Sequence, residues 1–234
     1  MKKVLVLSDL HLGSPNCNAR QVLRVLNEIP FDLLIINGDA YDHLNLHRLR
    51  HHHREVLARI WELSNNGIAV VWLKGNHDAD ILPLFNKVLE QYVIEHDEQR
   101  ICVIHGHQFD SLLRKYPAST ALMSRLYYYF QLVVKSNKFR EFIKYRSKSW
   151  LKVIGRVRHL AIEYAKQHHY SHIVCGHTHH AEITQVDGVT YVNSGDFMYM
   201  SCGGVMITLD DGPVKIQTLQ AIAPCKDKAN RHRL

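Results

Sequence analysis

The sequence predicts an α/β fold from two observations. In the first half of the chain, short apolar runs alternate with longer stretches in which apolar residues recur at helical spacing. In the second half, apolar runs are joined by Asp187-Gly188 and by Asp210-Asp211-Gly212, and Asp-Gly between two such runs is a strong hairpin signal. We therefore expect a strand–helix alternation followed by a part of the chain that is richer in hairpins.

The apolar runs give the expected strands, and the helical spacing gives the expected helices. Strands are predicted over residues 4–7, 33–36, 68–73, 92–95, 101–104, 170–175, 182–186, 190–193, 205–209 and 214–218. Helices are predicted over residues 19–29, 48–63, 81–90 and 158–168. Pro30 ends the first helix, and Asn65-Asn66-Gly67 ends the second.

Length and composition favour one globular domain. The chain has 234 residues, of which 46% are hydrophobic and 22% charged. We expect a single domain over residues 1–225 and a basic tail over 226–234. The apolar run after Lys2 and Lys3 is too short for a signal peptide, and no run approaches the roughly 20 residues of a membrane span. The five cysteines include no C-x-x-C pair, which favours reduced thiols and a cytoplasmic location.

The positive charge is concentrated in one segment. Between Ser111 and Leu160, twelve Lys or Arg residues accompany one acid, Glu141, so this segment carries +11. The rest of the chain has 17 basic and 21 acidic residues and carries −4. We interpret residues 111–160 as a basic helical insertion that favours an anionic partner, although such charge runs are often only a solvated face.

Metal-ligating residue types follow five of the predicted strands. In open α/β sheets, ligands bind outside the carboxyl ends of the strands, where loops from distant parts of the chain meet. The residues at these ends are Asp9 and His11; Asp39; Asn76; His105; and His177 and His179. Each motif alone has an ordinary interpretation as turn chemistry or as a hydrogen-bonded histidine. The five together predict a dinuclear metal site with oxygen and imidazole ligands, suited to Mn²⁺, Fe or Zn²⁺.

With these residues in view, the sequence resembles the calcineurin-like metallophosphoesterases. The family pattern D-x-H, G-D-x-x-D, G-N-H-[DE], H-G-[HD] and G-H-x-H matches motifs within residues 1–110 and 165–210. The matching residues are Asp9 and His11, Gly38-Asp39 with Asp42, Gly75-Asn76-His77-Asp78, His105-Gly106-His107, and Gly176-His177 with His179.

The resemblance implies a four-layer α/β/β/α sandwich and a division of the ligands. Asp9, His11, Asp39 and His179 are expected to hold one ion, and Asp39 bridges to a second ion completed by Asn76, His105 and His177. Two divalent cations lower the pKa of a bound water, so phosphoester hydrolysis needs no Ser or Cys nucleophile. His77 is expected to stabilise charge in the transition state or to protonate the leaving group, with Asp42 orienting it.

The substrate is less strongly indicated. The D-L-H-L-G start, the basic insertion and Asn193-Ser194-Gly195-Asp196 resemble the UDP-2,3-diacylglucosamine diphosphatases. That branch carries Arg where this chain has His77, and H-G-D where it has His107. Arg114 and Lys115 in the insertion are candidate substrate-binding residues.

Three functional hypotheses remain open at this point. They are hydrolysis of a pyrophosphate-linked, partly lipidic substrate, a general or nucleotide phosphodiesterase or phosphatase, and a non-catalytic interaction scaffold of the same fold. The insertion could also rest on the anionic inner face of a membrane. Nucleic acid is disfavoured as a partner, because only one isolated segment is basic and no recognition motif accompanies it.

Overall fold

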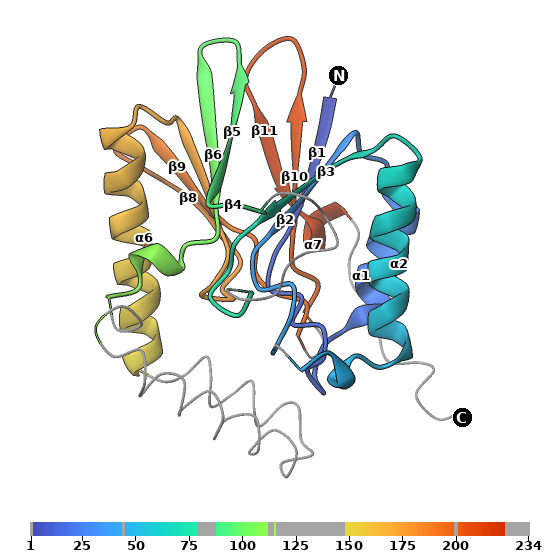
Figure 1. Ribbon diagram of the computed structural model, residues 1–234. Coiled ribbons are helices and arrows are strands. Elements are labelled where there is room, and N and C mark those ends of the chain that lie inside the picture. Colours follow the sequence, from blue (N-terminus) through green and yellow to red (C-terminus); the bar gives the residue numbers. More distant parts are fainter. Residues whose placement is uncertain are drawn as a thin grey trace.

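The computed structural model describes residues 2–43, 45–78, 88–111, 115, 148–198 and 201–222. Two β-sheets pack face to face, and helices cover the outer face of each sheet (Figure 1). The predicted α/β class and the four-layer α/β/β/α sandwich are confirmed.

The first sheet has the strand order β11-β10-β1-β2-β3-β4. Its strands are β1 (Lys2–Leu7), β2 (Leu33–Asn37), β3 (Ala69–Leu73), β4 (Val88–Leu89), β10 (Val205–Leu209) and β11 (Lys215–Thr218). Strands β1 to β4 run parallel, and β10 pairs antiparallel to β1 and to β11. The β10–β11 hairpin predicted from Asp210-Asp211-Gly212 is therefore present.

The second sheet has the strand order β5-β6-β7-β9-β8. Its strands are β5 (Gln91–His96), β6 (Gln99–Ile104), β7 (His172–Cys175), β8 (Glu182–Val186) and β9 (Val189–Asn193). Strands β6, β7 and β9 run parallel, while β5 and β8 pair antiparallel at the two edges. The hairpin predicted at Asp187-Gly188 joins β8 to β9.

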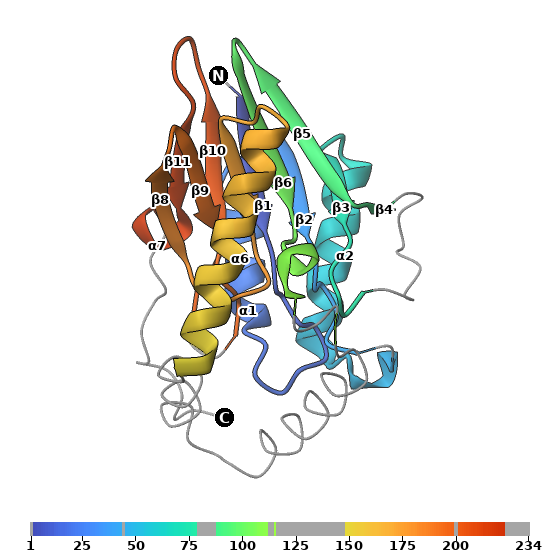
Figure 2. The same cartoon turned by 90° about the vertical axis from the view of Figure 1, so that its left-hand side faces the viewer.

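Helices complete the outer layers. Helices α1 (Ala19–Glu28) and α2 (His51–Asn65) lie on the first sheet, and α6 (Lys148–Gln167) lies across the second (Figure 2). The short helices are η1 (Leu46–Arg48), η2 (His107–Phe109) and α7 (Leu219–Ile222). Among the described residues, no helix has both the length and the apolar character needed to span a membrane.

The alternation of side chains along β1 shows why its sequence is apolar throughout. Val4 and Val6 belong to the core between the two sheets, whereas Leu5 and Leu7 belong to the core beneath α1 and α2. Successive residues of a strand point to opposite faces, so a strand covered on both faces needs apolar residues at every position. A third core lies between α6 and the second sheet. Burial of each large aliphatic side chain stabilises the fold by roughly 1.5–3 kcal/mol.

Three predicted helix boundaries differ from the structure by three residues or more. The helix expected over residues 81–90 is wrong at its end, because Val88 and Leu89 form β4 and pair with Trp72 and Leu73; residues 79–87 lie outside the described residues. Helix α2 begins after the turn η1, at His51.

Helix α6 begins at Lys148 rather than at residue 158. Ile154 and Val157 in its first half are buried like Ala161 in its second half, so one apolar stripe runs along the helix. The basic residues of this stretch are the reason that the sequence assigns it to the insertion. Residues 112–114, 116–147 and 223–234 lie outside the described residues, and the extents of the insertion and the tail remain predictions.

Candidate metal centre

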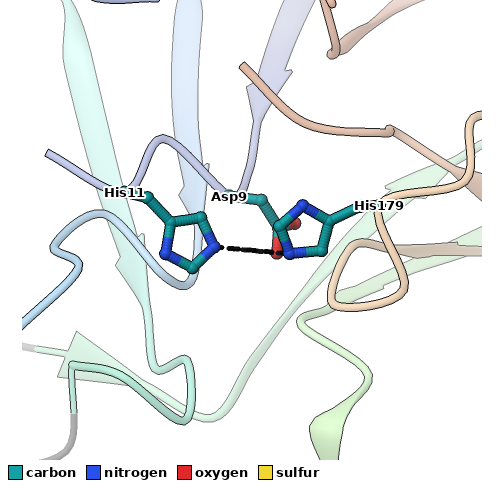
Figure 3. A group of neighbouring side chains, drawn as sticks. All are labelled: Asp9, His11 and His179. Atoms are coloured by element: carbon teal, nitrogen blue, oxygen red, sulfur yellow. Dashed lines mark hydrogen bonds and ion pairs between the residues drawn. The ribbon is translucent and has the colours of Figure 1, made fainter. Parts of the chain in front are cut away.

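The loops after β1 and β7 bring the first group of predicted ligands together. Asp9 and His11 follow β1, and His179 follows β7 in the other sheet. His179 Nε2 lies 3.3 Å from Asp9 Oδ1 and 3.3 Å from His11 Nε2. Figure 3 shows the two imidazoles facing each other beside the Asp9 carboxylate. One ligand atom from each of the three residues lies within 4.8 Å of the others, as a metal site requires.

The Asp39 carboxylate lies between this group and a second one. Its Oδ2 atom is 3.8 Å from His11 Nε2 and 3.5 Å from His105 Nε2. Asp39, His105 and His177 also offer ligand atoms within 4.8 Å of one another. Asp39 therefore occupies the position expected of a carboxylate that is shared by two groups of ligand atoms.

The donor atoms fit metal ions better than they fit one another. Asp9 Oδ1, Asn76 Oδ1 and His105 Nε2 are buried and have no hydrogen-bond partner among the described residues. A buried polar atom without a partner costs on the order of 1–3 kcal/mol of stability, so such an atom normally binds a water molecule or an ion. Oxygen and imidazole nitrogen donors without a thiolate suit Mn²⁺, Fe or Zn²⁺. Metal ions bound by the two groups would satisfy Asp9 Oδ1 and His105 Nε2.

The backbone of the ligand loops is strained. Among the described residues, positive φ angles occur at eight glycines and at eight other positions, five of which are predicted ligands. Those five are Asp9, His11, Asp39, His177 and His179, with φ angles of 53°, 47°, 51°, 63° and 57°. The left-handed region costs a residue with a Cβ roughly 1–2 kcal/mol, and such strain is concentrated at functional sites.

Two motif glycines allow the loops to approach closely. A Cβ at Gly176 would lie 2.4 Å from Ser8 Oγ and 2.5 Å from Asp9 Oδ2. A Cβ at Gly75 would lie 2.2 Å from the Asp39 main-chain nitrogen. The glycines of G-H-x-H and G-N-H-D therefore make room for the strand-end loops of the neighbouring motifs.

The charges within the centre shift the pKa values of its members. Burial alone would lower the pKa of His105, but the Asp39 and Asp9 carboxylates outweigh it and raise the pKa to about 9. Burial would raise the pKa of Asp39, but the imidazoles of His105, His77 and His11 hold it well below its usual range. The carboxylate is thus ionised among imidazoles, which is the state in which it binds a cation.

His77 lies beside the ligands. Its Nδ1 atom donates a hydrogen bond of 2.9 Å to the main-chain oxygen of Asp42, and its Nε2 atom is 4.0 Å from Asp39 Oδ2. Burial opposes protonation of His77, but Asp39 and the Asp42 carbonyl raise its pKa. Asp42 thus contacts His77 through its backbone, whereas the Asp42 carboxylate accepts a 3.2 Å bond from Arg48.

Only one of the two candidate substrate-binding residues lies within the part of the chain that the structure describes. Lys115 is exposed, and Arg114 lies outside the described residues. Their assignment remains a prediction.

Sequence reasoning assigned no role to four side chains that support the centre. Ser8 donates a 2.6 Å bond to Asp9 Oδ2, and Asp78 accepts bonds from the main-chain nitrogens of Tyr41 and Gly75. Asp110 and Asp196 accept bonds from His177 and His179. Asp78 and Asp196 stand inside motifs that the sequence already displays, whereas Asp110 carries no pattern that could have singled it out.

The comparison with known families agrees with this geometry. The family model "Calcineurin-like phosphoesterase" matches residues 2–181 of the chain. The chain belongs to this family. Members of the calcineurin-like phosphoesterase family use divalent metal ions. The candidate ligand groups here are Asp9, His11 and His179; His11, Asp39 and His77; and Asp39, His105 and His177. No curated protein matches the chain significantly.

Solved structures share the fold at low sequence identity. The phosphoesterase YfcE from E. coli has a TM-score of 0.52 and 18% identity, with 94% of each chain covered. A conserved uncharacterised protein from Streptococcus pneumoniae TIGR4 has a TM-score of 0.46 and 16% identity, over 92% of this chain and 87% of that one. Vps29 from Entamoeba histolytica, complexed with zinc, has a TM-score of 0.46 and 18% identity, over 92% of this chain and 97% of that one. At 18% identity, the likeness to YfcE concerns the fold alone.

Proposed function

We propose that the chain is a metal-dependent phosphoester hydrolase. The observation that carries the proposal is the position of Asp39 Oδ2, 3.5 Å from His105 Nε2 and 3.8 Å from His11 Nε2, between two groups of ligand atoms. When bound, two divalent cations would activate water and neutralise the charge that develops on the phosphoryl oxygens. Asp9, His11, Asp39 and His179 would hold one ion, and Asp39, Asn76, His105 and His177 the other.

His77 would act on the substrate. Because its Nδ1–H is held by the Asp42 carbonyl oxygen, the Nε2 atom is the one that faces the centre. Burial lowers the pKa of His77, but Asp39 and the Asp42 carbonyl raise it above its ordinary value, which favours a proton on Nε2. That proton can be donated to a phosphoryl oxygen or to the leaving oxygen. In this proposal the Asp42 carbonyl orients His77, and the Asp42 carboxylate has no direct part.

Metal removal and replacement test the activity. The protein is freed of metal with a chelator, reloaded with Mn²⁺, Fe²⁺ or Zn²⁺, and assayed with bis-p-nitrophenyl phosphate and p-nitrophenyl phosphate. We expect hydrolysis only in reloaded protein, strong loss in Asp39→Asn and His77→Gln, and no change in Asp187→Asn. Asp187 is a matched carboxylate on the surface, where it pairs with Lys166 at 2.7 Å.

The assay also separates the remaining hypotheses. A protein that binds two metal ions but hydrolyses neither ester would support the interaction scaffold instead. Hydrolysis of the monoester alone would support a phosphatase, and hydrolysis of the diester a phosphodiesterase. The comparison requires metal content to be measured in the same samples.

A cavity beside the centre supports a substrate that is both anionic and partly apolar. Its volume is about 210 Å³, and its lining combines the cations Lys152 and Arg156 with apolar side chains. The other lining residues are Phe109, Asp110, Ser111, Val153 and Val157. Asp110 also accepts a 3.0 Å bond from the predicted ligand His177, so the cavity adjoins the metal centre.

The finer proposal is a pyrophosphate-linked substrate such as UDP-2,3-diacylglucosamine. Lys152 and Arg156 would contact one anionic group while the metals hold the scissile phosphate. UDP-2,3-diacylglucosamine is compared with bis-p-nitrophenyl phosphate at equal metal loading. A kcat/KM for the nucleotide lipid no higher than that for the aryl diester would reject this substrate and leave the general phosphodiesterase.

A further inference from the structure

Each histidine of the G-H-x-H motif donates a hydrogen bond to its own buried aspartate. His177 Nε2 lies 3.0 Å from Asp110 Oδ2, and His179 Nδ1 lies 2.5 Å from Asp196 Oδ2. The aspartates come from unrelated parts of the chain: Asp110 follows η2, and Asp196 follows β9. Asp110 is 9% exposed and Asp196 is 2% exposed, so water competes little for either bond.

The two bonds involve different ring nitrogens. A neutral imidazole has one N–H donor and one acceptor nitrogen, and the bond that it donates determines which nitrogen can bind a metal. The bond to Asp110 leaves Nδ1 of His177 as the acceptor. The bond to Asp196 leaves Nε2 of His179, which faces Asp9 Oδ1 at 3.3 Å.

The two histidines belong to different groups of ligands. His179 groups with Asp9 and His11, whereas His177 groups with Asp39 and His105. Each aspartate therefore acts on one of the two groups. A carboxylate that accepts the second N–H of a ligand histidine fixes the ring and raises the basicity of the ligating nitrogen.

Asp196 is itself held in place. Its carboxylate accepts bonds from the Ser201 hydroxyl and, at 3.3 Å, from the Met198 main-chain nitrogen, and its own carbonyl oxygen accepts a 2.7 Å bond from Gly203. A Cβ at Gly203 would approach the Asp196 backbone to 2.5 Å, so the glycine permits this fold of the loop. The position of His179 is thus fixed from the loop after β9.

We infer that Asp110 and Asp196 are positioning residues, each of which sets the affinity of one metal ion of the centre. Asp196 orients His179 for the ion held with Asp9 and His11, and Asp110 orients His177 for the ion held with Asp39 and His105. This inference rests on the proposed dinuclear centre, but it concerns metal binding and not hydrolysis. The two ions can then be weakened separately.

Metal titration of Asp110→Asn and Asp196→Asn tests the inference. Asparagine keeps the size of the side chain and removes the charge. Mn²⁺ and Zn²⁺ binding to chelator-treated protein is followed by competition with a chromophoric chelator. We expect each variant to bind one of its two ions 10–100-fold more weakly and the other nearly normally. The control, Asp187→Asn, should bind both ions like the unmodified chain, because the Asp187 carboxylate contacts Lys166.

The double variant shows whether the effects are separate. Asp110→Asn combined with Asp196→Asn should lower the affinity for both ions. The inference is overturned if either single variant lowers the affinity for both ions equally, or leaves both affinities unchanged. Since no substrate is present, this failure is distinct from a failure to hydrolyse phosphoesters.

A measurement on the unmodified chain covers the case in which a variant does not fold. Long-range ¹H–¹⁵N NMR of zinc-loaded protein identifies the protonated nitrogen of each histidine. We expect the proton of His177 on Nε2 and that of His179 on Nδ1. The opposite tautomer at either histidine would overturn the inference for that residue.

Discussion

Asp9 and His177 connect the two sheets at the centre of the site. Asp9 follows β1 of the first sheet, and its Oδ2 atom accepts a 3.0 Å hydrogen bond from the main-chain nitrogen of His177, after β7 of the second sheet. Asp9 Oδ1 is left to face His179 Nε2 at 3.3 Å. One carboxylate thus both joins the sheets and offers an oxygen to the proposed metal centre, so the loop conformation also determines where that oxygen lies.

Gly176→Ala is expected to disturb this connection. The added Cβ would lie 2.4 Å from Ser8 Oγ and 2.5 Å from Asp9 Oδ2, both of them buried. We expect a loss of about 1–3 kcal/mol in the free energy of unfolding, measured by urea denaturation, because overpacking forces the neighbours apart. The matched control is Gly155→Ala in α6, where a Cβ meets nothing within 4 Å and removal of a helical glycine should stabilise by about 0.5–1 kcal/mol. Equal effects of the two substitutions would contradict this explanation.

The strained backbone predicts an unusual order for two substitutions of His11. Both His11→Gly and His11→Ala remove the imidazole, but only glycine adopts a φ of 47° without steric cost. We expect the glycine variant to be more stable than the alanine variant by roughly 1 kcal/mol in metal-free protein. At a position with ordinary φ, such as Arg54 in the first half of α2, the order should reverse. Urea midpoints of the four variants provide the measurement.

Much of the fold could be predicted from the sequence. The buried runs that form β1, β2, β6 and β7 are apolar at successive positions because both of their faces are covered, so their existence was clear without tertiary information. The start of α6 was missed because Lys148 to Arg158 was assigned by its charge, whereas the buried Ile154 and Val157 determine where it packs.

The candidate ligands were predicted from local motifs, but the residues that hydrogen-bond to them were not. Asp9, Asp39 and His105 each follow a recognisable strand, so their meeting could be expected from the rule that strand ends converge. Asp110 meets His177 across 67 residues of sequence, and no spacing in the sequence indicates that contact. The use of the Asp42 carbonyl, in place of its carboxylate, likewise depends on the loop conformation.

The pKa of His105 predicts how the stability of the metal-free protein depends on pH. In the folded protein, burial lowers the pKa of His105, but Asp39 and Asp9 outweigh burial and raise the pKa to about 9. The unfolded chain has the ordinary value of about 6.5. A raised pKa stabilises the fold fully below the unfolded value, and that contribution is lost as pH rises through the folded value.

We therefore expect the free energy of unfolding of chelator-treated protein to fall between about pH 6.5 and 9, by at most about 3 kcal/mol. Urea denaturation across this range measures the change. In His105→Gln the fall should be much smaller, whereas in His159→Gln, an exposed position on α6, it should persist. A flat profile in the unmodified chain would show that Asp39 and His105 are not an ion pair when metal is absent.

The cavity beside the centre predicts a change in substrate binding rather than in chemistry. Lys152 and Arg156 line it without contacting the predicted ligands directly, so their reversal to Glu should raise KM for an anionic substrate and leave kcat nearly unchanged. We expect about a tenfold increase in KM for the double variant at low salt, and less at 0.5 M salt, because exposed charges are screened. Hydrolysis of UDP-2,3-diacylglucosamine, or of a smaller anionic phosphodiester if that lipid is not a substrate, gives the two constants.

Lys215→Glu is the control, since β11 begins at the opposite end of the sheet from the metal centre (Figure 1). An equal rise in KM for Lys215→Glu would attribute the effect to net charge, and a fall in kcat alone would place Lys152 or Arg156 in the reaction itself.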